Sequence, residues 1–242
     1  MAKITTLFID KGGVLIDNTR LSPQYRRLLG EFLPTELGGD ADAWANANVG
    51  AASRAFARYQ QASMSAPTTS IREWFTEDVR RWLYEMCDEV GRPRPPAAQA
   101  DRIANEAHEY VRRRVDIGAQ RIVERLRELD SRGMKLHVAS GDQHSDIVGY
   151  LETMGTRELF DQVYGSDLLN VWKSSPAYYR AILAVTATDP GAALVVDDSE
   201  PAIGWAAECG LRGVLVQRAE GEAFETAVLR AFDEVEWLIE RA

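Results

Sequence analysis

Hydrophobic residues at the start of the chain form one short, continuous run. Residues 4–9 are apolar or β-branched, and the run stops at the polar, glycine-rich segment from Asp10 to Gly13. A run of this length that ends at a glycine turn predicts a buried strand. We therefore expect a strand that carries a polar residue, Asp10, at its carboxyl end.

Helical spacing replaces this pattern between about residues 21 and 115. Phe75, Val79 and Trp82 are 4 and 3 positions apart, which places them along one face of a helix. The proline-rich segment 91–96 separates two helical stretches. Because no strand pattern occurs here, we expect an all-helical insertion.

Helical and strand patterns alternate after this insertion. Strands are expected at residues 135–139, 162–164, 192–196 and 213–216, with helices at 122–129 and 147–154 and from Pro176 and Pro201. Such alternation predicts a parallel sheet that is covered by helices on both faces. The predicted fold class is α/β, with a Rossmann-like doubly wound parallel sheet as the core and the all-helical domain inserted into it.

Chemically active side chains lie where several of these strands end. Asp10 follows the first strand, Ser140 follows the strand at 135–139, and the pair Asp197 and Asp198 closes the strand at 192–196. Ligands of open parallel sheets bind outside the carboxyl ends of the strands. We therefore expect these polar residues to meet in one crevice.

Composition narrows the classes of function. Of 242 residues, 45 % are hydrophobic and 27 % charged, as in globular proteins, and the net charge of −9 argues against a general role on nucleic acid or anionic membranes. No apolar run approaches the roughly 18 residues of a spanning helix and no cleavable signal is evident, so a cytoplasmic location is expected. Cys87 and Cys209 form neither a metal pattern nor a disulfide framework.

Four motifs in this order resemble those of the haloacid dehalogenase-like hydrolases. They are residues 8–15 around Asp10, residues 138–140 ending in Ser140, Lys173 ahead of Pro176, and residues 195–199 followed by 206–210. The insertion is similar to the helical cap (C1 type) of the largest branch of that superfamily, which closes over the site and selects substrates. The resemblance implies a catalytic core of residues 1–17 and 116–242 and a cap domain of residues 18–115.

The resemblance also implies roles for individual residues. Asp10 would be the nucleophile that attacks phosphorus and forms an aspartyl-phosphate. Ser140 would donate its hydroxyl to a phosphoryl oxygen, together with the backbone around Gly141 and, from the first motif, Gly12. Lys173 would neutralise the phosphate and keep Asp10 ionised.

Electrostatics predicts a divalent cation at the same place. Asp197 and Asp198 beside Asp10 would repel one another unless a cation lay among them, and hard oxygen ligands completed by water suit Mg²⁺. By resemblance the protein ligands would be Asp10, Asp198 and the main-chain carbonyl of Gly12. Asp197 would lie outside this set and face Lys173.

Three positions depart from the family pattern. Gly12 replaces a second aspartate that protonates the leaving oxygen in most of the phosphatases, which favours a good leaving group such as an acyl or anomeric phosphate. Ala202 replaces an Asp or Asn that supports the metal, so metal affinity is expected to be low. Lys11 replaces an aliphatic residue, and strand alternation would point it away from the site unless the turn rotates it inward.

Other polar residues are weaker candidates. Asp17, Asp142 and His144 are alternative proton donors, with solvent-exposed side chains as the plainer interpretation. Arg54 and Arg58 lie on one helical face of the insertion, where they would contact an anionic substrate or form a solvated basic surface.

We therefore predict a Mg²⁺-dependent phosphatase that acts on a small phosphorylated metabolite, with no nucleic-acid or membrane partner, as a monomer or homodimer. The first alternative is a 2-haloacid dehalogenase, in which an aspartate attacks carbon without metal or general acid. Such enzymes typically carry Tyr-Gly-Thr after the nucleophile and lack the acidic pair. The second alternative is a catalytically impaired protein that still binds phosphate.

Overall fold

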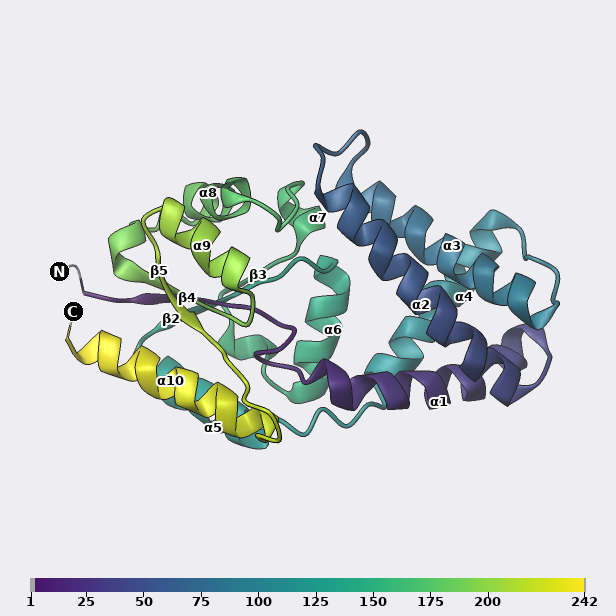
Figure 1. The fold of residues 1–242 in the computed structure, drawn as a ribbon, viewed down its shortest axis with the longest axis horizontal. Coiled ribbons are helices and arrows are strands. Elements are labelled where there is room, and N and C mark those ends of the chain that lie inside the picture. Colours follow the sequence, from purple (N-terminus) through teal and green to yellow (C-terminus); the bar gives the residue numbers. More distant parts are fainter. Residues whose placement is uncertain (1–2, 242) are drawn as a thin grey trace. The chain divides into compact units, whose positions relative to one another are not determined.

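The computed structural model describes residues 3–241, which form two compact units (Figure 1). The first unit combines the residues up to Asn18 with those from Ile117 onward. The second unit is the continuous segment Thr19–Asp116. The chain thus leaves the first unit just after the first motif and returns to it about a hundred residues later.

A five-stranded parallel sheet forms the centre of the first unit, as the alternating pattern predicted. Its strands are β1 (Thr6–Ile9), β2 (Lys135–Ala139), β3 (Gln162–Tyr164), β4 (Ala193–Asp197) and β5 (Arg212–Leu215). The spatial order is β3-β2-β1-β4-β5, so β1 is the middle strand and lies between β2 and β4. The topology switches direction at β1, which is where open sheets of this kind form their ligand crevice.

Helices cover both faces of this sheet. They are α5 (Gln120–Ser131), α6 (His144–Met154), α7 (Ser166–Leu169), α8 (Pro176–Thr186), α9 (Glu200–Glu208) and α10 (Phe224–Glu240), with short 3-10 turns at Arg157–Leu159 and Pro190–Ala192. Figure 1 shows α8 and α9 over one face and α5 and α10 over the other. The α10 helix is an addition to the predicted elements, and it buries an apolar stripe that includes Val228, Phe232 and Val235.

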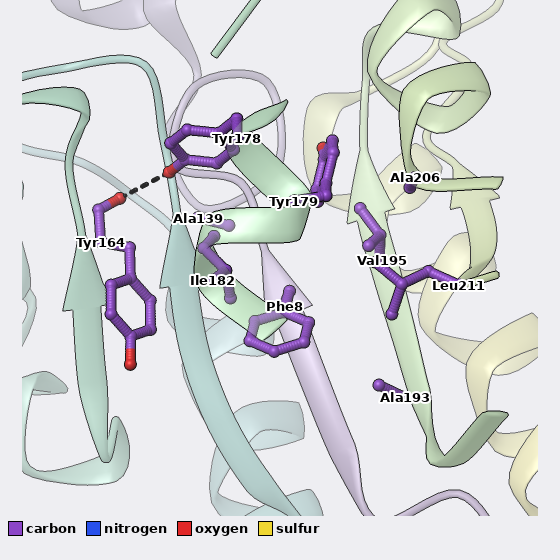
Figure 2. Packing of buried hydrophobic residues seen from close by; sticks show 10 residues of the cluster. All are labelled: Phe8, Ala139, Tyr164, Tyr178, Tyr179, Ile182, Ala193, Val195, Ala206 and Leu211. Atoms are coloured by element: carbon purple, nitrogen blue, oxygen red, sulfur yellow. Dashed lines mark hydrogen bonds between the residues drawn. The ribbon is translucent and has the colours of Figure 1, made fainter. Parts of the chain in front are cut away.

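Aromatic side chains fill the space between the sheet and α8 (Figure 2). Phe8 on β1 and Val195 on β4 point to this face and pack with Tyr178 and Tyr179 of α8. The Tyr178 hydroxyl lies 2.9 Å from the main-chain oxygen of Tyr164 and donates toward it. This cluster anchors α8 against the sheet and so determines where the segment before α8 runs.

The second unit is built from α1 (Asn18–Leu37), α2 (Ala41–Ser63), α3 (Ile71–Val90) and α4 (Ala97–Arg112). No strand occurs in its described residues, as predicted. A capping box between Ser70 and Glu73 starts α3, and Gly91 in the left-handed conformation ends it. In the part of the chain that the structure describes, no helix is long and apolar enough to cross a membrane.

Ion pairs between α2 and α3 engage the arginines that were candidates for substrate binding. Arg58 pairs with Asp78 and, at 2.7 Å, with Glu85. Arg54 also contacts Glu85, at 2.8 Å. Acidic side chains of α3 thus pair with both arginines and join helices within the second unit. The Arg58 side chain is only 16 % exposed, whereas the Arg54 side chain is 48 % exposed and stays in contact with solvent.

Candidate active site

Polar residues gather at the carboxyl ends of the three middle strands, β2, β1 and β4. Asp10 directly follows β1, and its backbone N–H still donates to Val196 of β4 at 2.9 Å. Ser140 directly follows β2, and Asp197 is the last residue of β4. Since the strands are parallel, all three ends lie at the same edge of the sheet.

Lys173 connects these strand ends. Its ammonium nitrogen lies 2.6 Å from Asp10 Oδ1 and 2.7 Å from Asp197 Oδ2, and it donates to the main-chain oxygen of Ala139 at 2.7 Å. An ammonium group has three N–H donors, so these acceptors use all of them. The side chain is only 7 % exposed, and such a buried charge is tolerated because it is paired this completely.

Three carboxylates surround the same point. Ligand oxygens of Asp10, Asp197 and Asp198 all lie within 4.8 Å of one another. Asp197 is buried, and both of its carboxylate oxygens already have partners: Oδ1 accepts the Ser199 N–H at 2.9 Å, and Oδ2 contacts Lys173. Asp198 is exposed. The Asp10 and Asp198 carboxylates are therefore better placed than Asp197 to bind a further group.

The turn after β1 approaches the end of β4 so closely that only glycine fits at residue 13. Gly13 has a φ of 73°, in the left-handed region, and a Cβ there would lie 1.9 Å from Asp198 Oδ2. A side chain would therefore displace the Asp198 carboxylate. Gly13 was predicted only as part of a glycine turn, and its close approach to Asp198 was not predicted.

Charge is unbalanced in this cluster, with three carboxylates and one buried ammonium. Burial and the neighbouring Asp197 raise the pKa of Asp10 to about 7, against the lowering effect of Lys173. Partial desolvation by the surrounding protein and the charge of Asp197 also raise the pKa of Asp198, although this residue is exposed at the surface. Burial disfavours the charge of Lys173, but Asp10 and Asp197 outweigh it and hold its pKa well above the ordinary value. The oxygen ligands and their excess negative charge fit a hard divalent cation.

Ser140 is buried in the turn that follows β2. Its main-chain oxygen lies 2.9 Å from the Tyr178 hydroxyl, which shares its single hydrogen between this oxygen and that of Tyr164, and the Ser140 Oγ accepts the Asp142 N–H at 3.3 Å. Gly141 lies between these two residues. Ser140 immediately follows Ala139, whose carbonyl contacts Lys173, so the turn with Ser140 and Gly141 adjoins the lysine and acidic cluster.

Lys11 does not extend into solvent. It is 8 % exposed, forms an ion pair with Asp142, and lies with its ammonium 5.0 Å from the centre of the Tyr150 ring. The turn therefore brings Lys11 against the segment after β2. Simple strand alternation, which would point it elsewhere, does not account for this direction.

Each candidate proton donor is engaged by another residue. Asp142 is paired with Lys11, which outweighs the effect of burial and lowers the pKa of Asp142. Asp17 lies 3.5 Å from Arg218. His144 Nδ1 lies 2.9 Å from the carbonyl oxygen of Val163, so this ring nitrogen points away from Asp10's strand toward β3.

Glycine and alanine occupy the two other unusual positions. A Cβ at Gly12 would lie 3.0 Å from the Asn18 side-chain nitrogen, so a larger residue there requires Asn18 to shift. Ala202 is buried in the first turn of α9, where its N–H donates to the Ser199 hydroxyl at 3.4 Å. Neither position offers a carboxylate to the cluster.

The two tyrosines of α8 were missed in the sequence analysis. Tyr178 supports Ser140, and the Tyr179 hydroxyl lies 3.5 Å from Asp197 Oδ2. Burial and the neighbouring acids raise the pKa of Tyr179, so it stays a neutral donor. Aromatic residues at helical spacing indicate a core face, and the pattern carries no sign of where their hydroxyls point.

The chain therefore has a parallel α/β sheet whose middle strand ends in a carboxylate that is ion-paired to a buried lysine. The sequence profile of haloacid dehalogenase-like hydrolases matches residues 4–210, and the chain belongs to this family. The resemblance drawn from the four motifs is thereby confirmed. A comparison with curated protein sequences finds no match.

Solved structures of low sequence identity share the fold. The L-2-haloacid dehalogenase from Xanthobacter autotrophicus is 16 % identical with a TM-score of 0.62, over 96 % of this chain and 83 % of that one. The 2-haloacid dehalogenase from Pseudomonas syringae pv. Tomato DC3000 is 16 % identical with a TM-score of 0.62, over 97 % and 99 %. A putative beta-phosphoglucomutase from Thermotoga maritima is 18 % identical with a TM-score of 0.56, over 94 % and 91 %.

Proposed function

We propose that this hydrolase is a Mg²⁺-dependent phosphatase that acts on a small phosphorylated metabolite through an aspartyl-phosphate on Asp10. The observation that carries the proposal is the cluster around Lys173, where one ammonium holds Asp10 and Asp197 and a further carboxylate, Asp198, lies beside them. A haloacid dehalogenase needs no acidic pair, whereas two extra carboxylates are costly near the nucleophile without a cation.

Asp10, Asp198 and the main-chain carbonyl of Gly12 would hold the metal ion. Bound Mg²⁺ supplies positive charge that offsets the carboxylates and polarises the phosphoryl oxygens. Asp197 would stay outside the ligand set, because its oxygens already bind Lys173 and the Ser199 N–H. The low metal affinity expected from Ala202 stays a prediction.

The reaction would proceed in two displacements at phosphorus. An Asp10 carboxylate oxygen attacks the phosphorus atom, and the bond from phosphorus to the leaving oxygen breaks with its electron pair going to that oxygen. Water then attacks the acyl-phosphate, which releases inorganic phosphate and regenerates the Asp10 carboxylate. Lys173 favours the ionised form of Asp10 against the effect of burial, and the Ser140 hydroxyl and the Gly141 backbone would bind phosphoryl oxygens.

The leaving group would be one that departs without a positioned acid. Gly12 has no carboxyl group, and Asp142 is held as a carboxylate by Lys11. A positioned general acid contributes roughly 10²–10⁴ in rate, so its lack penalises ordinary alkyl phosphates most. We therefore propose acyl or anomeric phosphates as the preferred substrate class.

A 2-haloacid dehalogenase is the second candidate function. Gly12 favours it, because a halide leaves without a proton and needs no acid. In this reaction the Asp10 carboxylate would attack carbon and displace the halide, and water would cleave the resulting ester. The acidic pair argues against it, and the likeness to structures described as dehalogenases is one of fold.

An assay that measures both leaving groups tests the proposal. Phosphate release from acetyl phosphate and from an aryl phosphate is measured with Mg²⁺ or with chelator, beside halide release from 2-chloropropionate. We expect phosphate release that needs Mg²⁺ and is lost in Asp10→Asn. The matched control is Asp130→Asn, an exposed aspartate at the end of α5, which should behave as the wild type.

The other outcomes separate the alternatives. Halide release in the presence of chelator would overturn the phosphatase in favour of the dehalogenase. If the wild type releases neither product but binds inorganic phosphate in a titration, the protein is the catalytically impaired binder.

A further inference from the structure

Lys11 occupies an unusual environment for a lysine. Its side chain is 10 % exposed, lies over the Tyr150 ring and ends in an ion pair with Asp142. Lysine is rarely buried unless it is paired, because removing an ammonium from water is costly. A residue held at this cost directly after the proposed nucleophile calls for a functional explanation.

The backbone of Lys11 is a rigid base for this side chain. Its carbonyl oxygen accepts hydrogen bonds from the N–H groups of Leu15 at 2.9 Å and Ile16 at 3.0 Å, which close the turn after β1. Its other neighbour is Asp10, whose N–H is bonded to β4. The Lys11 backbone is therefore fixed relative to the end of β1. The position of its ammonium, and of the carboxylate paired with it, depends on that strand end.

The partner of Lys11 belongs to the turn that carries Ser140. The Asp142 N–H donates to Ser140 Oγ at 3.3 Å, and the Asp142 carbonyl accepts the Ser166 N–H at 3.2 Å. A serine hydroxyl that accepts one hydrogen bond still has its own hydrogen to donate. Held in this way, Ser140 keeps that hydrogen for a substrate oxygen.

We propose that Lys11 is a positioning residue, which through Asp142 fixes the turn at residues 140–142 so that the Ser140 hydroxyl donates to the phosphoryl group. This inference rests on the proposed phosphatase function. It assigns a role to a lysine that replaces the aliphatic residue usual at this position. Lys11 would act through Ser140 and would not touch the substrate itself.

The test combines Lys11→Met with Ser140→Ala. Binding of inorganic phosphate in the presence of Mg²⁺ is measured by titration calorimetry, and amide hydrogen exchange of the peptide that covers residues 140–144 is measured without phosphate. We expect Lys11→Met to weaken phosphate binding about fivefold to twentyfold and to accelerate exchange in this peptide. In the Ser140→Ala background the same substitution should have no further effect on phosphate binding.

Three further variants control the experiment. Lys135→Met makes the same chemical change at an exposed lysine at the start of β2 and should leave both measurements unchanged. Asp142→Asn removes the other partner of the ion pair and should have the same effect on both measurements as Lys11→Met. Lys11→Arg keeps a cation at this position and should restore most of the affinity for phosphate. These variants also separate loss of the ion pair from general misfolding.

Two results would overturn the positioning role by itself. Unchanged exchange at residues 140–144 in Lys11→Met would show that the ion pair does not hold the turn, whatever the protein does. A loss of phosphate affinity that is equally large with and without Ser140 would show that Lys11 acts by another route. A wild type that neither binds nor releases phosphate would instead refute the proposed function, and the positioning role with it.

Discussion

The ammonium of Lys173 lies 2.6 Å from the carboxylate of Asp10, although 163 positions separate the two residues in the chain. The same ammonium contacts Asp197. Both carboxylates are largely buried, and their pairing with the Lys173 ammonium offsets the cost of removing their charges from water.

Removal of Lys173 should destabilise the protein in a pH-dependent way. In Lys173→Met two buried carboxylates lose their cation, and breaking a buried pair in this way costs about 3–5 kcal/mol of unfolding free energy. The loss should be larger at pH 8 than at pH 5, because protonation relieves the carboxylates at acidic pH. Urea unfolding with chelator present measures it, and Lys135→Met is the control. Equal stability of wild type and Lys173→Met at pH 8 would contradict the ion pair.

Mg²⁺ should raise the melting temperature of the wild type at pH 8. A ligand that binds only the folded state at ten times its Kd stabilises by about 1.4 kcal/mol, which corresponds to roughly 2–6 °C for a chain of this size. Asp198→Asn should abolish most of this shift, whereas Glu200→Gln, at an exposed residue two positions later, should keep it. An undiminished shift in Asp198→Asn would place the metal elsewhere.

Gly13→Ala should lower the unfolding free energy by more than the strain of its backbone conformation alone explains. Gly13 and Gly133 have similar φ values of 73° and 77°, but a Cβ at Gly133 meets nothing within 4 Å. Gly133→Ala should therefore lose only the about 1–2 kcal/mol of left-handed strain. Gly13→Ala should also displace Asp198 and lose the Mg²⁺-dependent rise in melting temperature. If both variants respond to Mg²⁺ as the wild type does, Gly13 does not support the metal site.

His137 should make the protein sensitive to acid. Its ring stacks on Phe8 at 5.3 Å, and Nδ1 is buried with no hydrogen-bond partner among the described residues. Burial lowers the pKa of His137 below its ordinary value of 6.5. The unfolded chain therefore binds the proton first, so this contribution to stability is complete above pH 6.5 and is lost as pH falls toward the lower folded pKa.

The corresponding test is His137→Phe, which keeps an aromatic ring on Phe8. Between pH 7 and pH 5 the wild type should lose more unfolding free energy than this variant does. Chemical denaturation at several pH values measures the difference. Parallel pH profiles for the two proteins would show that His137 is not the group responsible.

Local hydrophobic patterns were sufficient for most of the fold. The predicted strand at residues 135–139 coincides with β2, and that at 162–164 coincides with β3. Buried strands in a parallel sheet are short apolar runs between turn residues, so their ends are encoded locally. The four family motifs likewise depend on residue identity and order, both of which can be read from the sequence without the structure.

These local hydrophobic patterns do not predict which side chains contact one another at the sheet edge. The sequence by itself determined the strands, the helical insertion, the family and the expectation that Asp10, Ser140 and Asp198 share one edge. The family resemblance led us to expect Lys173 beside Asp10 and Asp197. Only the tertiary structure decided that the third donor of Lys173 binds the Ala139 carbonyl, and that Lys11 turns toward Asp142. The reason is physical: local spacing dictates which face of an element is buried, whereas the partner of a buried charge depends on which distant segments close packing brings within hydrogen-bond distance.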